Sequence, residues 1–509
     1  MTQPREPRTY GGWRRRRSMG LLGMGVGATF AVLAAVVTLL LATALSPRML
    51  LYLLPPVLVV ALLGLAPAGG TPLATVLLTR WRWWYGTRRG FTRFRSGSRL
   101  ELPGVLAATS LLSVPDGYGR PYGLVWDQRA GHLTATLRVV ANSPWLADPD
   151  DADTWVACWG SWLASLGHVP ALRWVSVTVQ TAPEPGGQLA DTVAAAIDPA
   201  APASARAIVA QLVASAPAAA AHVETRVSLT FDPTASPPAP MTLELAVAEV
   251  SRTLDGLESA LGSCGITVLG RATAAQIAAV VRGAFDPAVR GEVSRAQAGA
   301  RTTGWADAVP LSAEELPGCY RHDSGVSVSW CWQEAPRQNV HSDVLARLIA
   351  PGPYLKRVTL QYRPLPAAAA DRVLESEVTS AAFRQAYRHR LGRDETARDA
   401  FDQARARQAA REEAMGAGVC LVGMFVTVTV LDAADLPQAV AATEAAAESS
   451  KIRLRLLTGS QAAGFATTLP CGACPPRHGS PLILAAGAGA TSRASTGSWT
   501  CRRPTAPSA

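Results

Sequence analysis

Hydrophobic and polar positions follow three patterns along this chain. Residues 18–47 and 49–79 contain no charged side chain, which gives two apolar runs of 30 and 31 residues. From about residue 120 to 469, stretches with period-2 polarity alternate with alanine-rich stretches of helical periodicity. After Leu469 the periodicity stops and Pro, Gly, Ser and Thr dominate. These patterns predict two membrane spans, a folded α/β part and a disordered tail.

The two apolar runs predict a transmembrane hairpin, with spans at approximately 20–45 and 50–79. Roughly 20 apolar residues suffice to cross a bilayer. Arginines precede the first run and follow the second, and basic flanks stay on the cytoplasmic side. We therefore expect a two-span protein of the inner or plasma membrane, with both termini and the folded part in the cytoplasm.

A cleaved export signal is the alternative interpretation of the same start. Arg16-Arg17 precedes an apolar run, and Ala42-Thr43-Ala44 resembles a cleavage site. However, the run is much longer than the 7–15 residues of a signal peptide, and a second apolar run follows it directly. The hairpin is the favoured prediction.

The alternating region predicts strands and helices that follow one another in a regular order. Strands are expected at 122–126, 133–140, 172–181, 222–231, 265–269, 325–333, 356–363, 418–431 and 452–457. Helices are expected at 151–166, 187–197, 202–215, 242–262, 273–284, 342–350, 366–390, 394–415, 433–449 and 459–467. The ordering indicates an α/β or α+β fold.

The same element order occurs twice in the folded part. A strand at 133–140 or 325–333 precedes a β-α-β-α-β series in each half, and each series contains insertions. This order predicts two tandem lobes of the ferredoxin-like split βαβ type. The expected organisation is a basic tail (1–18), the hairpin (19–79), a juxtamembrane segment (80–120), a first lobe (121–300), a second lobe (301–469) and a disordered tail (470–509).

Positive charge is concentrated at the membrane flanks. The net charge is +10, but residues 1–99 alone carry +13, which leaves −3 for the remainder. Arginines and aromatic residues are interleaved after the second span, and such side chains suit the headgroup level and anionic lipid. The alternative, stacking on single-stranded nucleic acid, is not favoured next to a span. The expected membrane-interface residues are Arg14, Arg15, Arg16, Arg17, Arg80, Trp81, Arg82, Trp83, Trp84, Arg88 and Arg89.

Few residues suggest catalysis. Neither of the two lysines, Lys356 and Lys451, lies in a Gly-x-x-x-x-Gly-Lys-Ser/Thr motif, and the chain contains no Gly-x-Ser-x-Gly and no His-Glu-x-x-His. The segment His322-Asp-Ser-Gly325 looks catalytic but is interpreted as a turn before a strand. The acidic cluster from Asp148 to Asp153 is interpreted as a helix N-cap, and the tryptophans that follow it as a packing face.

The eight cysteines are interpreted as structural. Cys158, Cys264, Cys331 and Cys420 lie in apolar patterns and read as small core residues. Cys471-Gly-Ala-Cys474 with His478 resembles a zinc or redox motif. However, a second ligand pair is missing, and prolines follow where a thioredoxin-like helix should begin. No metal, cofactor or catalytic residue is expected.

One expected helix, 394–415, is charged on nearly all sides. A helix of this kind usually projects from the fold into solvent. The alternative is an arm that docks a partner.

Several segments together resemble an uncharacterised family of actinobacterial two-span integral membrane proteins. They are Thr9-Tyr-Gly-Gly-Trp13, Tyr118-Gly-Arg-Pro-Tyr122, Asp153-Thr-Trp-Val156, Tyr320-Arg-His-Asp-Ser-Gly-Val-Ser327, Arg357-Val-Thr-Leu360 and Gly459-Ser-Gln-Ala-Ala463. The resemblance covers about 1–469 and ends where Pro470 and Cys471 begin a divergent tail. Members of the family accompany conjugation or type IV secretion-like ATPases. The resemblance assigns no catalytic residue to this chain.

The resemblance implies a non-enzymatic, membrane-anchored subunit of a conjugation or type IV secretion-like machine. Its cytoplasmic part would form a platform for a separate P-loop ATPase and would meet other membrane subunits and anionic lipid headgroups. Homo-oligomerisation stays open, and direct binding of nucleic acid is not expected. The alternatives are a scaffold of another actinobacterial export system, such as a type VII-like apparatus, and a membrane-tethered enzyme of unrecognised type.

Overall fold

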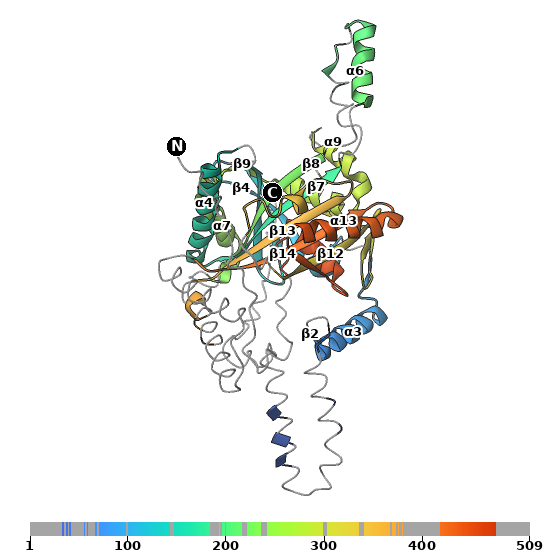
Figure 1. Cartoon of the computed structure of the whole chain (residues 1–509). Coiled ribbons are helices and arrows are strands. Elements are labelled where there is room, and N and C mark those ends of the chain that lie inside the picture. The colour runs from blue at the N-terminus through green and yellow to red at the C-terminus, as the bar shows by residue number, and fades with distance from the viewer. Residues whose placement is uncertain are drawn as a thin grey trace, which may run out of the picture. The chain divides into compact units, whose positions relative to one another are not determined.

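The computed structural model combines helices with antiparallel β-sheet, which makes the fold α+β (Figure 1). It describes residues 71–97, 100–142, 147–183, 200–215, 221–235, 242–298, 303–334, 340–366, 369–372 and 418–474, with isolated positions at 33, 34, 37, 38, 40, 41, 55, 59, 67, 68, 193, 196–198, 375 and 379. Residues 80–475 belong to one compact unit, and 17–79 belong to another.

Most of the expected membrane hairpin falls outside the described residues. The isolated positions between 33 and 59 are helical, and β1 (Pro67–Ala68) pairs with β2 (Thr71–Pro72). Among the described residues, no helix combines the length and the apolar character that crossing a bilayer requires. The basic tail (1–18), the segment 394–415 that was expected to be a charged helix, and residues 475–509 also lie outside the description.

One 13-stranded sheet runs through the larger unit. Its main path is β3-β10-β11-β12-β14-β13-β7-β8-β6-β5-β4, with β15 paired to β12 and β9 paired to β6. The strands are β3 (Arg93–Arg95), β4 (Thr109–Pro115), β5 (Pro121–Asp127), β6 (His132–Ala141), β7 (Leu172–Pro183), β8 (Ala221–Phe231), β9 (Ile266–Arg271), β10 (Ser312–Glu315), β11 (Tyr320–His322), β12 (Gly325–Glu334), β13 (Leu355–Pro364), β14 (Cys420–Val430) and β15 (Arg453–Leu456).

The two halves of the sheet have the same strand order. In the first half the neighbours are β9-β6-β8-β7, and in the second they are β15-β12-β14-β13, with every pair antiparallel. The halves join where β7 pairs with β13 over the register Lys356↔Thr181 to Tyr362↔Val175. The repeat that the sequence predicts is therefore present as a repeated strand order within one continuous sheet.

The described helices come from both halves and from the segments around them. They are α3 (Leu73–Arg88), α4 (Pro149–Ser165), α6 (Ala203–Ser215), α7 (Leu243–Ala260), α8 (Ala274–Phe285), α9 (Arg290–Ala298), α10 (Ala346–Ile349), α13 (Leu436–Ser449) and α14 (Gln461–Thr467). These bounds confirm the expected helices at 151–166, 202–215, 242–262, 273–284, 433–449 and 459–467, and shorten the one at 342–350.

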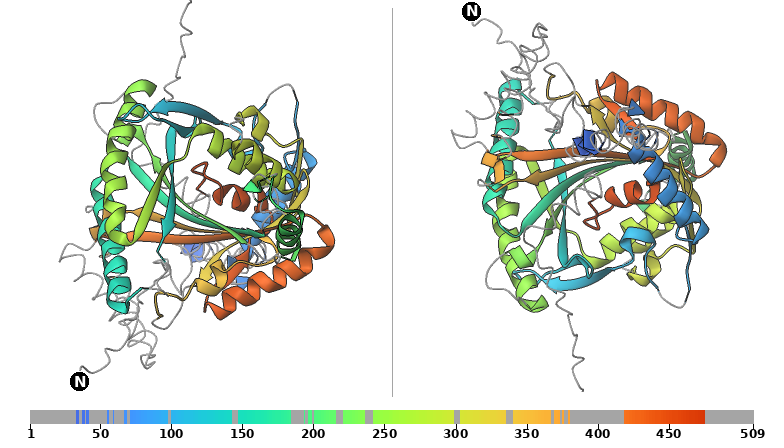
Figure 2. Two further views of the ribbon diagram at one scale, coloured as in Figure 1. Left: turned by 90° about the horizontal axis from the view of Figure 1, so that it is seen from above. Right: turned by 90° about the horizontal axis from the view of Figure 1, so that it is seen from below.

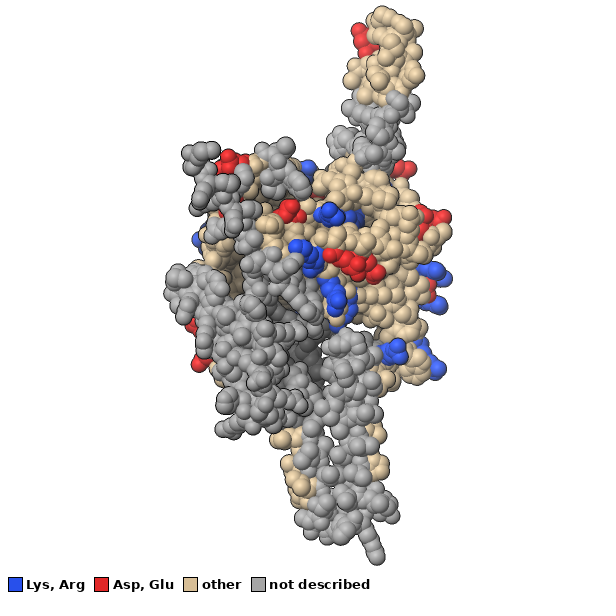
Figure 3. All heavy atoms as spheres, in the orientation of Figure 1, with Lys and Arg blue, Asp and Glu red and all other residues tan. Residues whose placement is uncertain are grey.

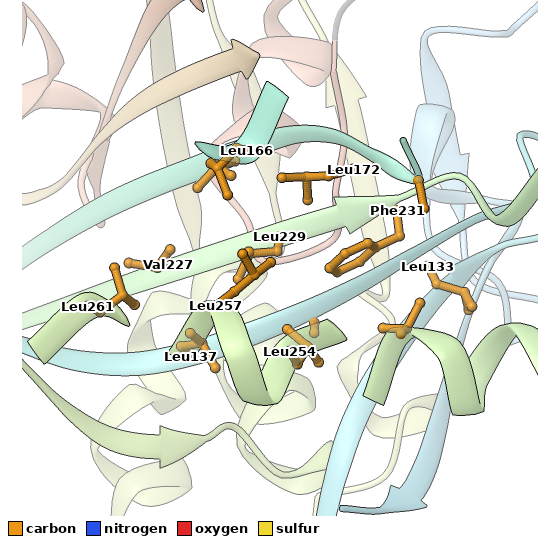
Figure 4. Packing of buried hydrophobic residues seen from close by; sticks show 14 of the residues in the cluster. Leu133, Leu137, Leu166, Leu172, Val227, Leu229, Phe231, Leu254, Leu257 and Leu261 are labelled. Carbon is orange, nitrogen blue, oxygen red and sulfur yellow. The ribbon is translucent and has the colours of Figure 1, made fainter. Parts of the chain in front are cut away.

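The outer face of the first half is apolar and is covered by α4 and α7. Leu133, Leu137, Leu229 and Phe231 alternate along β6 and β8 and are fully buried against α7 (Figure 4). The apolar positions of α7 recur at helical spacing, so one face meets the sheet. Burying each of these leucines fully stabilises the fold by roughly 1.5–3 kcal/mol. The outer face of the second half packs in the same way against α10 and α13.

The inner face of the sheet carries α8 and α14, the helices that follow the last strand of each half. Seen along the sheet in Figure 2, α14 lies on the concave side, and α7 and α13 lie outside. The two inner helices meet through Phe285 and Phe465, whose ring centroids are 5.0 Å apart. Phe94 of β3 and Leu111 of β4 pack on this cluster. Residues 80–120, expected to form only a juxtamembrane segment, therefore contribute strands to the sheet and side chains to its core.

Candidate functional site

Helix α3 and Arg89, the residue directly after it, carry the described part of the expected membrane-interface residues. Trp81, Trp84 and Tyr85 are 58%, 47% and 41% exposed, although side chains of this type are usually covered. The Arg88 guanidinium lies 4.3 Å from the ring centroid of Trp84, and that of Arg89 lies 5.2 Å from the ring of Tyr85. Figure 3 shows basic side chains on the surface of this helix. The exposed surface of α3 thus presents stacked pairs of cations and aromatic rings.

Trp83 faces the folded unit and ties α3 to it. A Cβ atom at Gly459 would lie 3.1 Å from Cδ1 of Trp83, and Gly459 has a φ of +67°. Both facts favour glycine at this position. Arg80 is exposed beside these aromatic residues. Arg14, Arg15, Arg16 and Arg17 and the side chain of Arg82 lie outside the description.

The His322 segment forms a hairpin turn, as the sequence predicts. His322 pairs with Gly325 across the turn, and its ring is buried. Its Nδ1 lies 2.6 Å from the carbonyl oxygen of Phe285, and its Nε2 lies 2.7 Å from Oγ of Ser327. Burial lowers the pKa of His322 to about 4. Ser324 donates its hydroxyl to Asp286, so the serine that His322 contacts is Ser327 of β12 and not Ser324 of the turn.

The acidic cluster caps α4, which confirms the N-cap interpretation. The Asp148 side chain accepts a hydrogen bond from the backbone N–H of Asp150 at 3.1 Å. Trp159 and Trp162 stack with ring centroids 4.9 Å apart, and Trp162 donates to the carbonyl oxygen of Leu257 on α7. These tryptophans form the packing face of α4.

The Cys471–Cys474 motif is packed against the inner face of the sheet. Cys471 is 3% exposed, and burial raises the pKa of its thiol to about 12. Cys474 donates to Oε1 of Gln361 at 3.6 Å. The packed part of the chain therefore continues beyond the expected boundary at residue 470. His478 lies outside the description.

The inner face of the central strands is polar, yet it is buried. Hydroxyl groups pair across neighbouring strands, as in Thr134–Thr230 and Ser329–Thr427, both with oxygens 2.9 Å apart. We call this surface the polar inner face; its buried residues are Thr134, Thr136, Ser176, Thr178, Arg226, Ser228, Thr230, Ser327, Ser329, Arg357, Thr359, Gln361, Thr427 and Thr429. The period-2 polarity was visible in the sequence, but it is equally typical of a solvated face.

Helix α14 and the turn after it cover the polar inner face. The Gln461 side chain accepts from the backbone N–H of Ser329 at 2.7 Å and donates to its carbonyl oxygen at 3.2 Å. Gly472 has a φ of +67°, and a Cβ there would lie 2.0 Å from Oγ1 of Thr134. The glycine lets the backbone of the turn lie directly on the sheet.

Two arginines are buried in this polar inner face. Arg226 donates to Oε2 of Glu224 at 3.0 Å and to Oε1 of Gln180 at 2.9 Å. Arg357 is 1% exposed; its Nε donates to Oγ1 of Thr468 at 3.1 Å, and its guanidinium lies 4.7 Å from the ring centroid of Phe465. Neither Nη1 nor Nη2 of Arg357 has a hydrogen-bond partner among the described residues.

The buried residues of the polar inner face carry a net positive charge. Burial and the nearby charge of Arg226 lower the pKa of Arg357 to about 9, so Arg357 is still charged at neutral pH. Arg226 has the carboxylate of Glu224 beside it, whereas no carboxylate pairs with Arg357 within the described part of the chain. The site can therefore accept negative charge. The sequence showed only that two arginines occupy strand positions, not that they are enclosed.

Comparison with protein-family models and with curated proteins finds no match to this chain.

Proposed function

We propose that this chain is a non-enzymatic, membrane-anchored subunit of a conjugation or type IV secretion-like machine. Its folded unit would form a cytoplasmic platform that binds a separate P-loop ATPase. The proposal of membrane anchoring rests on the surface of α3, where Trp81, Trp84 and Tyr85 are exposed beside Arg88 and Arg89. This helix begins at Leu73, within the second apolar run, and its arginines follow the end of that run.

The physical chemistry of α3 suits the headgroup region of a bilayer. Amphipathic rings are most stable where one edge is apolar and the other is wet. Each arginine near an anionic membrane surface contributes about 1 kcal/mol of attraction. Trp83 and Gly459 fix the same helix to the folded unit, so the folded unit would be held close to the membrane.

We also propose that each half of the sheet is a ferredoxin-like split βαβ unit behind a two-helix transmembrane hairpin. The orders β9-β6-β8-β7 and β15-β12-β14-β13 support the first part, because a split βαβ repeat places its fourth and third strands on either side of its first. The long connections between β7 and β8 and between β13 and β14 would be insertions at the same point of each unit.

The structural contacts made by the candidate catalytic groups support a non-enzymatic role. His322 is buried and neutral, Ser324 bonds Asp286, and Cys471 keeps its proton at neutral pH. Each of these groups serves packing or turn formation in the fold.

Affinity purification of the full-length chain from its native membranes tests the proposal. We expect a protein with a P-loop motor domain to co-purify in near-stoichiometric amount after mild crosslinking. Recovery of small helical-hairpin export substrates without a motor would favour the type VII-like alternative. Separately, a reporter fused near residue 300 should be active only in the cytoplasm. A periplasmic or extracellular signal there would contradict the platform model.

A further inference from the structure

Buried hydrogen-bond donors without acceptors cluster on the polar inner face. They are Nη1 and Nη2 of Arg357, Nε of Arg226 and Nε2 of Gln361, and none has a partner in the described part of the chain. All four are donors, so what the site lacks is acceptors. Leaving a buried donor unpaired is unfavourable, and more so when it carries charge.

The strand register places these donors on one face of three neighbouring strands, β8, β7 and β13. Along β7, Gln361 is opposite Ser176, Arg226 is opposite Thr178, and Arg357 is opposite Gln180. Thr359 lies between Arg357 and Gln361 on β13, and its Oγ1 is 2.9 Å from that of Thr178. Neighbouring strands are about 4.8 Å apart, so long side chains from β8 and β13 can approach one another over this hydroxyl pair.

We propose that the chain binds one small inorganic oxyanion, of the phosphate or sulfate class, between Arg357, Arg226 and Gln361 above the Thr178–Thr359 pair. An oxyanion presents only acceptors, and two of its oxygens match the parallel N–H groups of a guanidinium fork. It would supply the negatively charged partner that Arg357 lacks among the described residues.

The cover over the site favours a free ion over the phosphoryl group of a larger molecule. Phe465 stacks on Arg357, Thr468 accepts its Nε–H, and Cys471 is buried near Arg226. The four unpaired donor atoms each expose less than 1 Å². A nucleotide would require α14 and the turn at 468–474 to leave the sheet, whereas a small ion requires only a brief opening.

Thermal unfolding of the full-length protein in lipid nanodiscs tests the site. Exhaustively dialysed protein is titrated with potassium phosphate or sulfate against potassium chloride at constant ionic strength. We expect a saturable rise in Tm with either oxyanion and a smaller effect of chloride. Equilibrium dialysis with radiolabelled phosphate should give one bound ion per chain. AMP and ATP form a separate arm; binding of these nucleotides without binding of free phosphate would contradict the inference.

Three variants make the test specific. Arg357→Met should lower phosphate affinity by about a hundredfold, because two charge-assisted hydrogen bonds are lost. Gln361→Leu removes one neutral donor and should weaken binding by about tenfold, and it keeps the test usable if Arg357→Met fails to fold. Arg252→Gln, on the exposed surface of α7, should bind like the wild type. An equal Tm rise in Arg357→Met and in the wild type would show general salt exclusion and would overturn the proposal.

Discussion

Thr178 of β7 and Thr359 of β13 face each other at the junction of the two halves, and their hydroxyl oxygens are 2.9 Å apart in a buried position. Both halves are needed to satisfy these two groups. The junction is therefore polar on its inner face, where hydroxyls pair, and apolar on its outer face, where Val179 of β7 lies opposite Val358 of β13. Backbone pairing and side-chain pairing together make the two halves one sheet.

Replacing one hydroxyl of this pair should cost more than replacing both. We expect Thr178→Val or Thr359→Val alone to lower the free energy of unfolding by about 1–3 kcal/mol, because the remaining buried hydroxyl loses its partner. The double variant should lose clearly less than the sum of the two single losses. Urea unfolding of the full-length protein in nanodiscs, followed by tryptophan fluorescence, measures all four species. Strict additivity would show that the two hydroxyls do not depend on each other.

His322 should make the fold acid-sensitive. Its pKa is about 4 in the folded protein and about 6.5 when unfolded, so the unfolded chain binds more protons between these values. The stability from keeping His322 neutral is complete above pH 6.5 and is lost as pH falls towards 4, by about 3 kcal/mol in total. We expect the free energy of unfolding of His322→Gln, measured at pH 7 and 4.5, to depend less on pH than that of the wild type. The exposed His222→Gln should retain the full dependence; an unchanged slope in His322→Gln would contradict this assignment.

The sequence predicts most of the fold because its strands are strongly patterned. The alternation in β7, β8, β13 and β14 placed all four within two residues of their observed ends. The β4–β5 turn at 116–119 also follows local rules: the Asp116 side chain accepts from the backbone N–H of Tyr118, and Gly119 adopts a φ of +79°. Local rules decide these features, so one sequence suffices to see them.

The polar inner face could not be predicted in the same way. A strand with alternating Thr and Val looks the same whether its polar side meets water or another part of the protein. The burial of Arg357 depends on Phe465 and Thr468, which lie more than 100 residues away in the chain. Cys471 and Gly472 follow the end of the periodic pattern, so nothing in their local sequence indicates that they pack on the sheet. Only the long-range pairing of strands brings these residues together.

The turn that covers the polar inner face should not tolerate a side chain at Gly472. We expect Gly472→Ala to destabilise the folded unit by about 2 kcal/mol or more, since its Cβ would overlap Oγ1 of Thr134 and since φ is positive. Gly262→Ala is the matched control, because a Cβ there meets nothing within 4 Å. Differential scanning fluorimetry should separate the two variants clearly. Equal Tm values would place the turn away from the sheet.

The exposed rings of α3 should contact lipid headgroups if the folded unit is held at the membrane. We expect headgroup-labelled quencher lipids in nanodiscs to quench part of the tryptophan fluorescence of the full-length protein, and the double variant Trp81→Phe, Trp84→Phe to lose most of that quenchable part. Trp174→Phe is the control, because this ring is buried in the sheet edge-on to His132. Its removal should leave the quenched fraction unchanged or larger. If the double variant and the control lose the same fraction, α3 does not meet the membrane surface, and its stacked arginines and aromatic rings must instead face another protein.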